Sequence, residues 1–269
     1  MTKEEYLEEL NKAFKDFIFF EEDHHYEYKG ERVGISVTRL IEEYTNEFDS
    51  QSVAEKVAER DGKSVQEVLD EWHYKRDFSC EKGTTCHEWS QHLWSGKEYN
   101  ELLFDGSIEY INAVSKIQNQ AKQFKKDYED RLEHLYDELP IGSIEYDIAS
   151  CVDHLFYNKL SGGLVLVDYK TNSYLKGYNE KAYKKAMKAP LQHLNDDSLH
   201  HYYLQLSIYK FLIEKYAKVK VEEMFIVYFS ENIENYEIIE IPYLKKEVEE
   251  ILEWRKWEWK KKRKIILKF

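Results

Sequence analysis

The 269-residue sequence is poor in cysteine, proline and glycine, with three, three and ten of them, and it has no long apolar run. The odd number and irregular spacing of Cys80, Cys86 and Cys151 disfavour a disulfide framework and a zinc or iron–sulfur cluster. No stretch of about 18 apolar residues could cross a membrane. The charged start, MTKEEYLEEL, lacks the apolar segment of a signal peptide. We therefore expect a cytoplasmic protein with no membrane partner.

The scarcity of proline and glycine also leaves no segment with the composition of a linker. Because 42% of the residues are hydrophobic, the chain can form one sizeable core. We predict a single domain over residues 1–269. Its parts are a mainly helical region at 1–130, a region at 131–245 whose sheet and motif helix carry most candidate site residues, and a basic helix at 246–269.

The net charge of −13 argues by itself against a nucleic-acid partner. However, residues 245–269 hold ten Lys or Arg against five Glu. A basic patch of this kind can bind phosphate whatever the overall charge, and a solvated charged helix is an equal alternative. Trp254, Trp257 and Trp259 in this segment could stack on nucleic-acid bases. Packing of the tryptophans against the rest of the protein is the favoured interpretation.

The first half of the chain shows mostly helical periodicity. We predict a helix at 2–17, then a short hairpin at 24–38 with Gly30 in its turn. Ser36 and Thr38 are candidate N-caps for a helix through RLIEEY. Two helices follow, broken at Asp61–Gly62, and then a helix of about three turns lies between Gly83 and Gly96, with Thr84 or Thr85 as its cap.

Residues 108–130 have the clearest helical pattern, with one apolar face made of Ile111, Val114, Ile117, Ala121, Phe124 and Tyr128. After this helix the sequence becomes rich in β-forming residues and turns. It predicts a three-stranded meander up to residue 171, a helix at 198–217, strands at 222–230 and 236–243, and the basic helix. The expected fold is α/β (α+β), with a central mixed sheet flanked by helices.

The stretch LVLVDYKTN, residues 164–172, ends a buried strand with an acid and a base. If Tyr157 pairs with Leu164 across the hairpin, Asp153 falls opposite Asp168. Pairing Ser143 with Ile148 around the turn IEYD then places Glu138 opposite Asp153. This register predicts three carboxylates abreast on neighbouring strands. Glu145 and Asp147 are rival third acids, but they fall in the turn.

Adjacent carboxylates repel one another unless a positive group lies between them. Mg²⁺ is commonly held by one or two carboxylates together with a substrate phosphate. Strand alternation places Lys170 on the same face as Asp168, where an ammonium group could orient a water molecule or offset charge on a phosphate. For the hairpin alone, an ordinary ion pair between Lys170 and either aspartate is the favoured interpretation.

Four elements in the same order resemble the PD-(D/E)XK nuclease superfamily, and within it the RecB-like exonuclease branch. The matching residues are Gly83-x-x-x-His87, Asp153, Asp168-Tyr169-Lys170 and Gln205-x-x-x-Tyr209. Ser150 stands where the family usually has glycine before its first aspartate. The segment SVTRLIEEY, which contains Ser36 and Thr38, is similar to a DNA-contacting region of phage and mitochondrial single-strand exonucleases. The resemblance spans about residues 30–215.

The resemblance implies a metal site formed by Asp153, Asp168, His87 and the backbone carbonyl of Tyr169. Lys170 would position the attacking water, and Glu138 would complete the metal shell. Two further pairs of residues would orient the lysine or the DNA strand: Gln205 with Tyr209, and Ser36 with Thr38.

We therefore expect a Mg²⁺- or Mn²⁺-dependent DNA exonuclease with one or two ions and no iron–sulfur cluster. Its substrate would be single-stranded DNA or a duplex end, and a helicase, a recombination protein or a second copy of the chain could be a partner. Two alternatives remain open. One is a nucleic-acid-binding or assembly protein on a degenerate nuclease fold, and the other is a restriction-type endonuclease.

Overall fold

The computed structural model describes all residues except 100–103, 173–174, 176–184 and 267–269, and it describes the side chains of the last helix as far as Lys261. Within this part the chain forms seven α-helices, a mixed six-stranded sheet and a small antiparallel sheet of three strands. The predicted fold class, a mixed sheet flanked by helices, is confirmed. None of the described helices is both long enough and apolar enough to span a bilayer.

The N-terminal region contains a small sheet as well as helices. Helix α1 (Lys3–Phe14) begins at a capping box formed by Thr2 and Glu5 and ends three residues before the predicted limit. Strand β1 (Phe17–Phe20), which the sequence pattern did not indicate, pairs with β2 (His25–Tyr28). Strand β3 (Glu31–Arg32) completes the predicted hairpin, whose turn contains Gly30 at a φ of 80°.

The chain then forms strand β4 (Ile35–Ser36) and helix α2 (Val37–Glu42). Ser36 is the N-cap, because its side chain accepts a hydrogen bond of 3.1 Å from the Arg39 amide. Thr38 lies inside the helix, so of the two candidate caps only Ser36 has this role.

Helices α3 (Ser50–Asp61) and α4 (Val65–Ser95) are separated at Gly62, as predicted. The prediction of a separate short helix that begins at Gly83 is wrong. Helix α4 is 31 residues long, runs through Gly83 and ends at Ser95, with Gly96 as its C-cap. A single glycine weakens a helix by only about 1 kcal/mol. Tertiary contacts on both sides outweigh that cost: buried Lys82 pairs with Glu231 at 2.8 Å, and Thr85, expected as a cap, shares a 3.0 Å hydrogen bond with Tyr110.

Helix α5 (Ile108–Tyr128) confirms the strongest helical pattern in the sequence. Val114, Ile117, Ala121 and Phe124 are buried as predicted. Ile111 is 41% exposed, so its assignment to the buried face is wrong. The buried face is rotated relative to the prediction, because Ala113 and Gln120 are buried on the other side of the stripe.

The predicted meander is confirmed as the antiparallel strands β5 (Leu132–Ser143), β6 (Ile148–Asn158) and β7 (Leu164–Lys170). Helix α6 (Ser198–Leu212) and a π-helical turn (Ile213–Ala217) lead to β8 (Val221–Tyr228), which is parallel to β7. Strand β9 (Glu237–Glu240) then pairs with β8, while β4 runs parallel to β6. Helix α7 (Lys245–Ile266) follows the last strand.

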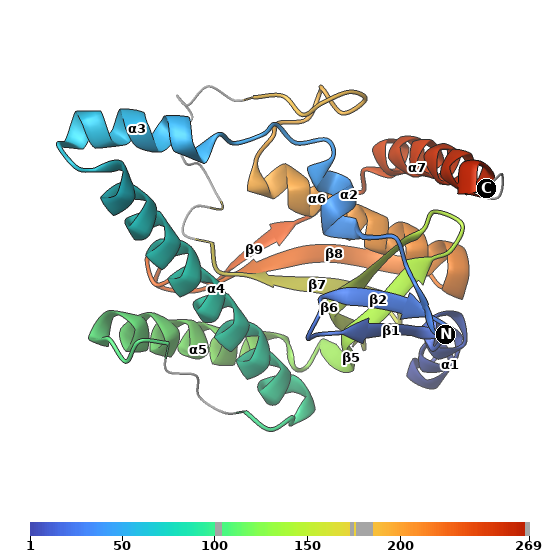
Figure 1. Cartoon of the computed structure of the whole chain (residues 1–269). Coiled ribbons are helices and arrows are strands. Elements are labelled where there is room, and N and C mark those ends of the chain that lie inside the picture. The colour runs from blue at the N-terminus through green and yellow to red at the C-terminus, as the bar shows by residue number, and fades with distance from the viewer. Residues whose placement is uncertain (100–103, 173–174, 176–184, 267–269) are drawn as a thin grey trace.

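The helices cover the two faces of the large sheet (Figure 1). On β7, Val165 and Val167 pack into a core with residues of α4 and α5. Leu164 and Leu166 point the other way, into the larger core that also includes residues of α1, α2, α6 and α7. Because both faces are covered, β7 is apolar at every position up to Asp168.

Two glycine substitutions test this packing. A Cβ atom at Gly142 would lie 2.4 Å from the Phe17 ring and 2.9 Å from the Ile148 carbonyl oxygen. Gly142→Ala should therefore lower the free energy of unfolding by about 1–3 kcal/mol in denaturant titrations. At Gly83 the nearest atom, Thr171 Oγ1, would be 3.7 Å away. Gly83→Ala should raise the free energy of unfolding by about 0.5–1 kcal/mol. Equal effects of the two variants would contradict the packing described.

Candidate active site

Strand β7 presents Asp168 and Lys170 on one face at its C-terminal end. The alternation that places Leu164 and Leu166 under α6 continues to these two residues, while Tyr169 joins the opposite core. Lys170 Nζ lies 2.6 Å from Asp168 Oδ2 and 4.0 Å from Asp153 Oδ2. The acid and base at the end of the strand are therefore in contact with each other and near a second acid.

The hairpin register that predicted this proximity is confirmed. Tyr157 pairs with Leu164, and the ladder continues to His154 and Val167. Asp153 and Asp168 occupy the next position of the same register, just beyond the last paired residues. The carboxylate of Asp153 is 24% exposed and that of Asp168 is 2% exposed. One acid thus faces a solvent-accessible space, and the other lies behind it.

The buried carboxyl group of Asp168 has an unusual environment. Burial raises its pKa to about 7, with Lys170 opposing this shift and Asp153 reinforcing it. Its Oδ1 atom is buried and has no hydrogen-bond partner in the described structure. An uncompensated buried carboxylate oxygen next to a second carboxylate favours the binding of a cation.

Lys170 stays positively charged in this environment. Burial opposes the charged form, but Asp168 and Asp153 together raise the pKa of Lys170 above its usual value. Its Nζ atom also lies 4.7 Å from the ring centroid of Tyr202 on α6. Tyr202 was not among the predicted site residues, although it lies one helical turn before Gln205 on the same face. Its hydroxyl donates a 3.0 Å hydrogen bond to Asn172, just beyond β7.

His87 reaches the site from α4. Its Nδ1 atom lies 3.5 Å from Asp153 Oδ2. Burial, reinforced by the positive charge of Lys170, lowers the pKa of His87 to about 4. The imidazole is therefore neutral at neutral pH, which is the form that can ligate a metal ion. The structure brings His87, Asp153, Asp168 and Lys170 together.

Glu138 keeps the predicted register opposite Asp153 but lies outside the hydrogen-bonded ladder. The β5–β6 ladder pairs Asp137 with His154 and Leu139 with Val152, in the expected register, but it leaves Glu138 unpaired at a φ of 51°. The Glu138 side chain is 59% exposed and lies 3.9 Å from Lys97. The left-handed backbone at this position interrupts the ladder, which a register read from the sequence could not reveal.

Asp137, the neighbour of Glu138, is buried and participates in a different cluster. Its Oδ1 atom lies 2.9 Å from His154 Nδ1 and 2.8 Å from His134 Nε2. The histidines hold the pKa of Asp137 well below its usual range despite the opposing effect of burial. This cluster lies beside Tyr169, whose ring centroid is 4.4 Å from that of His154.

Gln205 and Tyr209 are connected as their helical spacing predicted. Gln205 Nε2 donates a 2.7 Å hydrogen bond to the Tyr209 hydroxyl, which shares another of 2.8 Å with Ser150. The hydroxyl of Ser150 therefore connects β6 to α6. Gln205 also lines a hollow of about 220 Å³ together with Thr38 and Tyr202. Of the four predicted orienting residues, Gln205 and Thr38 line this hollow, Tyr209 is buried behind Gln205, and the side chain of Ser36 caps α2.

The rival acids Glu145 and Asp147 lie in the β5–β6 turn, as predicted. Asp147 Oδ2 is 3.2 Å from the buried guanidinium group of Arg255, and Glu145 pairs with Lys215 and Lys256 at 2.8 and 2.5 Å. These acids therefore hold α7 and the end of α6 against the turn.

The side chains that the structure places together as possible metal ligands are two carboxylates, of Asp153 and Asp168, and the imidazole of His87. Among the described residues, no three His, Cys, Asp or Glu side chains converge in the arrangement of a metal centre. The unpartnered oxygen of Asp168 and the nearby Asp153 nevertheless fit a hard cation such as Mg²⁺, which needs few protein ligands.

Comparisons with known proteins give little further information. No protein-family model matches the chain, and no curated protein is significantly similar to it. A crystal structure from Eubacterium rectale, named "Putative exonuclease", is 16% identical with a TM-score of 0.30. The match covers 64% of this chain and 70% of that one. A TM-score this low does not establish a shared fold.

The electrostatics of the site can be measured directly. In metal-free protein, the side-chain carboxyl carbon of Asp168 should titrate near pH 7 in ¹³C NMR spectra. Lys170→Met should raise this pKa, because an opposing positive charge is lost, and Asp153→Asn should lower it, because a negative charge is lost. Titration of Asp168 near pH 4 in the wild-type protein would show that the carboxylate is not desolvated as described.

Proposed function

We propose that this protein is a metal-dependent deoxyribonuclease that acts as an exonuclease. The observation that supports the proposal is the buried carboxylate that Asp168 holds beside Asp153. Its Oδ2 lies 2.6 Å from Lys170, while its Oδ1 has no hydrogen-bond partner in the described structure. An ordinary surface ion pair would leave its carboxylate solvated and its pKa low. The raised pKa of Asp168 instead supports the proposal, because a bound cation would supply the positive charge that favours the ionised carboxylate.

The proposed roles follow from the geometry. Asp153 and Asp168 would hold Mg²⁺ or Mn²⁺, assisted by neutral His87 and the Tyr169 carbonyl. When bound, the ion would polarise the scissile phosphate and stabilise the leaving oxygen. Because Lys170 stays protonated, it acts as a hydrogen-bond donor that orients the attacking water and offsets charge on the phosphate.

The residues of α6 would position Lys170 and the strand that is cut. Tyr202 lies against the ammonium group of Lys170, and Gln205 faces the adjoining hollow while bonded to Tyr209. Exposed Glu138 could supply a solvent-side acid at the edge of the site. DNA, either a single strand or a duplex end, is the proposed substrate.

Metal binding can be tested without any activity. Mn²⁺ should raise the melting temperature of the wild-type protein, because a ligand that binds only the folded state adds about 2.7 kcal/mol at a hundred times its Kd. Asp168→Asn should abolish this Mn²⁺-dependent increase. Glu145→Gln is the matched control, since Glu145 is held by two lysines in the distant turn, and it should keep the response. An undiminished Mn²⁺ response in Asp168→Asn would place the metal elsewhere.

Cleavage is tested with end-labelled linear, circular and single-stranded DNA in the presence of Mg²⁺ or Mn²⁺. We expect degradation of DNA with free ends, and Lys170→Met should lower kcat by roughly a hundred-fold or more. Lys12→Met, which removes a 73% exposed lysine from α1, is the matched control.

Two other outcomes would contradict the exonuclease proposal, and each indicates a different function. Discrete fragments from circular DNA would indicate an endonuclease. Absence of cleavage together with metal-independent DNA binding would indicate a binding protein on a degenerate nuclease fold.

A further inference from the structure

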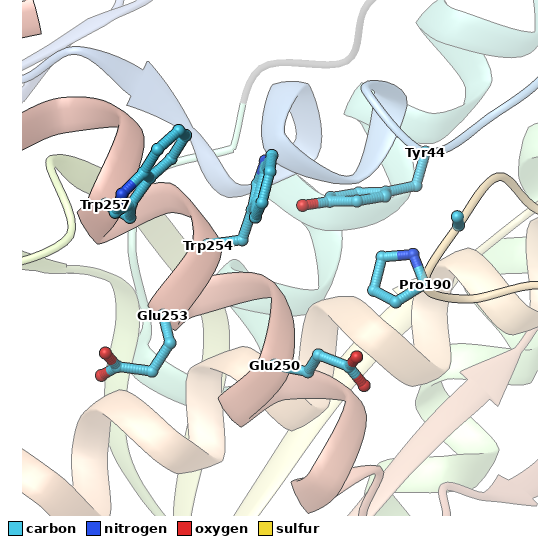
Figure 2. A pocket seen from close by; sticks show the side chains of 7 residues that line it. Tyr44, Pro190, Glu250, Glu253, Trp254 and Trp257 are labelled. Atoms are coloured by element: carbon cyan, nitrogen blue, oxygen red, sulfur yellow. The ribbon is translucent and has the colours of Figure 1, made fainter. Parts of the chain in front are cut away.

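A second and larger hollow, of about 700 Å³, lies between helix α7 and the segments after α2 and before α6. The residues that line it are Tyr44, Ala189, Pro190, Glu250, Glu253, Trp254 and Trp257. In Figure 2 the two indole rings project from one stretch of α7 toward the side where Tyr44 and Pro190 lie. The hollow is thus lined by three aromatic residues, two small apolar residues and two glutamates from three parts of the chain.

The two tryptophans are not used to attach the helix. Trp254 and Trp257 are 54% and 53% exposed, and their ring centroids are 5.1 Å apart at an interplanar angle of 32°. Helix α7 is instead anchored by Val248, Ile251 and Leu252, which are fully buried. The predicted packing of the terminal tryptophans is therefore wrong for this pair. Two neighbouring exposed indoles are unusual on a protein surface and indicate a binding role.

Charge is distributed unevenly along this face of α7. Glu250 and Glu253 lie on its N-terminal side, and Glu253 is 3.6 Å from Lys256. On the C-terminal side, Lys261 Nζ lies 5.0 Å above the ring of Trp257. The sequence from 260 to 264 is KKKRK. The tryptophans thus lie where an acidic part of the helix changes to a strongly basic part.

This hollow and the smaller one beside the candidate active site are lined by neighbouring residues of the chain. Tyr44 lines the larger hollow, and the next residue, Thr45, lines the smaller one that contains Tyr202 and Gln205. Tyr202 in turn contacts Lys170. Consecutive residues thus line the two hollows, and this is the basis for a strand path from the tryptophans toward Lys170.

We propose that Trp254 and Trp257 form a stacking platform for the unpaired bases of single-stranded DNA. The phosphates of the strand lie on the side of Lys260 and Lys261, away from Glu250. A single strand fits better than a duplex, because only unpaired bases can offer their faces to an indole ring. The proposal rests on the proposed nuclease function, which it refines by naming the substrate class and the path of the strand.

Binding of a fluorescein-labelled twenty-residue oligo(dT), measured by anisotropy in EDTA, tests the platform while cleavage is impossible. Trp254→Ala and Trp257→Ala should each weaken binding on the order of ten-fold, as expected for the loss of one base–aromatic stack. The corresponding phenylalanine variants should bind nearly as tightly as the wild-type protein, because they retain an aromatic face. Lys12→Ala should bind like the wild-type protein.

A labelled abasic strand of the same length isolates the role of the bases. It should bind weakly, and with the same affinity for the wild-type protein and Trp257→Ala. Glu250→Gln should strengthen oligo(dT) binding, because a carboxylate that lines the hollow and repels the negatively charged strand as a whole is removed. If the occupant were instead a basic peptide, the same substitution would weaken binding of an Arg/Lys-rich peptide and leave oligo(dT) binding unchanged.

The proposal is overturned if the wild-type protein does not bind oligo(dT), or if both alanine variants bind it as the wild-type protein does. Because both side chains are half exposed, the variants should keep the wild-type melting temperature, which confirms that they fold. These outcomes are separate from failure of the nuclease proposal. If only the nuclease proposal failed, tryptophan-dependent binding of oligo(dT) would persist, but Mg²⁺ or Mn²⁺ would produce no cleavage.

Discussion

The buried pair of Asp168 and Lys170 is the constraint around which the candidate site is arranged. A carboxylate that is 2% exposed can remain ionised only when positive charge lies close to it. Lys170 supplies part of this charge at 2.6 Å, while burial and Asp153 still hold the pKa of Asp168 near 7. The positive charge around Asp168 is therefore incomplete, and the proposed divalent cation rests on this feature.

The rest of the fold holds this pair in place. Strand β7 is anchored in two cores at once, since successive side chains point to opposite covered faces. The parallel crossover through α6 places Tyr202 against Lys170 and connects Tyr209 to Ser150 on β6. Helix α4 crosses near the end of β7 and contributes His87. Elements that are distant in sequence thus converge at the carboxyl end of one strand.

The terminal helix is attached by one set of side chains and leaves another set exposed. Arg255 and Lys256 pair with Asp147 and Glu145 in the β5–β6 turn, so these two basic residues attach the helix. Trp254 and Trp257, on another side, remain exposed. The net charge of −13 therefore does not measure the attraction between a DNA strand and this helix, because attraction depends on the local arrangement of charges.

The sequence by itself determined the three strands of the meander, the hairpin register and the shared face of Asp168 and Lys170, because these follow from local periodicity and turn length. It also indicated the connection between Gln205 and Tyr209, which depends only on helical spacing. Only the tertiary structure decided that α4 continues through Gly83, that Glu138 turns toward solvent, and that two tryptophans of α7 stay exposed. Each of these depends on contacts with residues far away in the chain, which outweigh local preference and leave no trace in the local pattern.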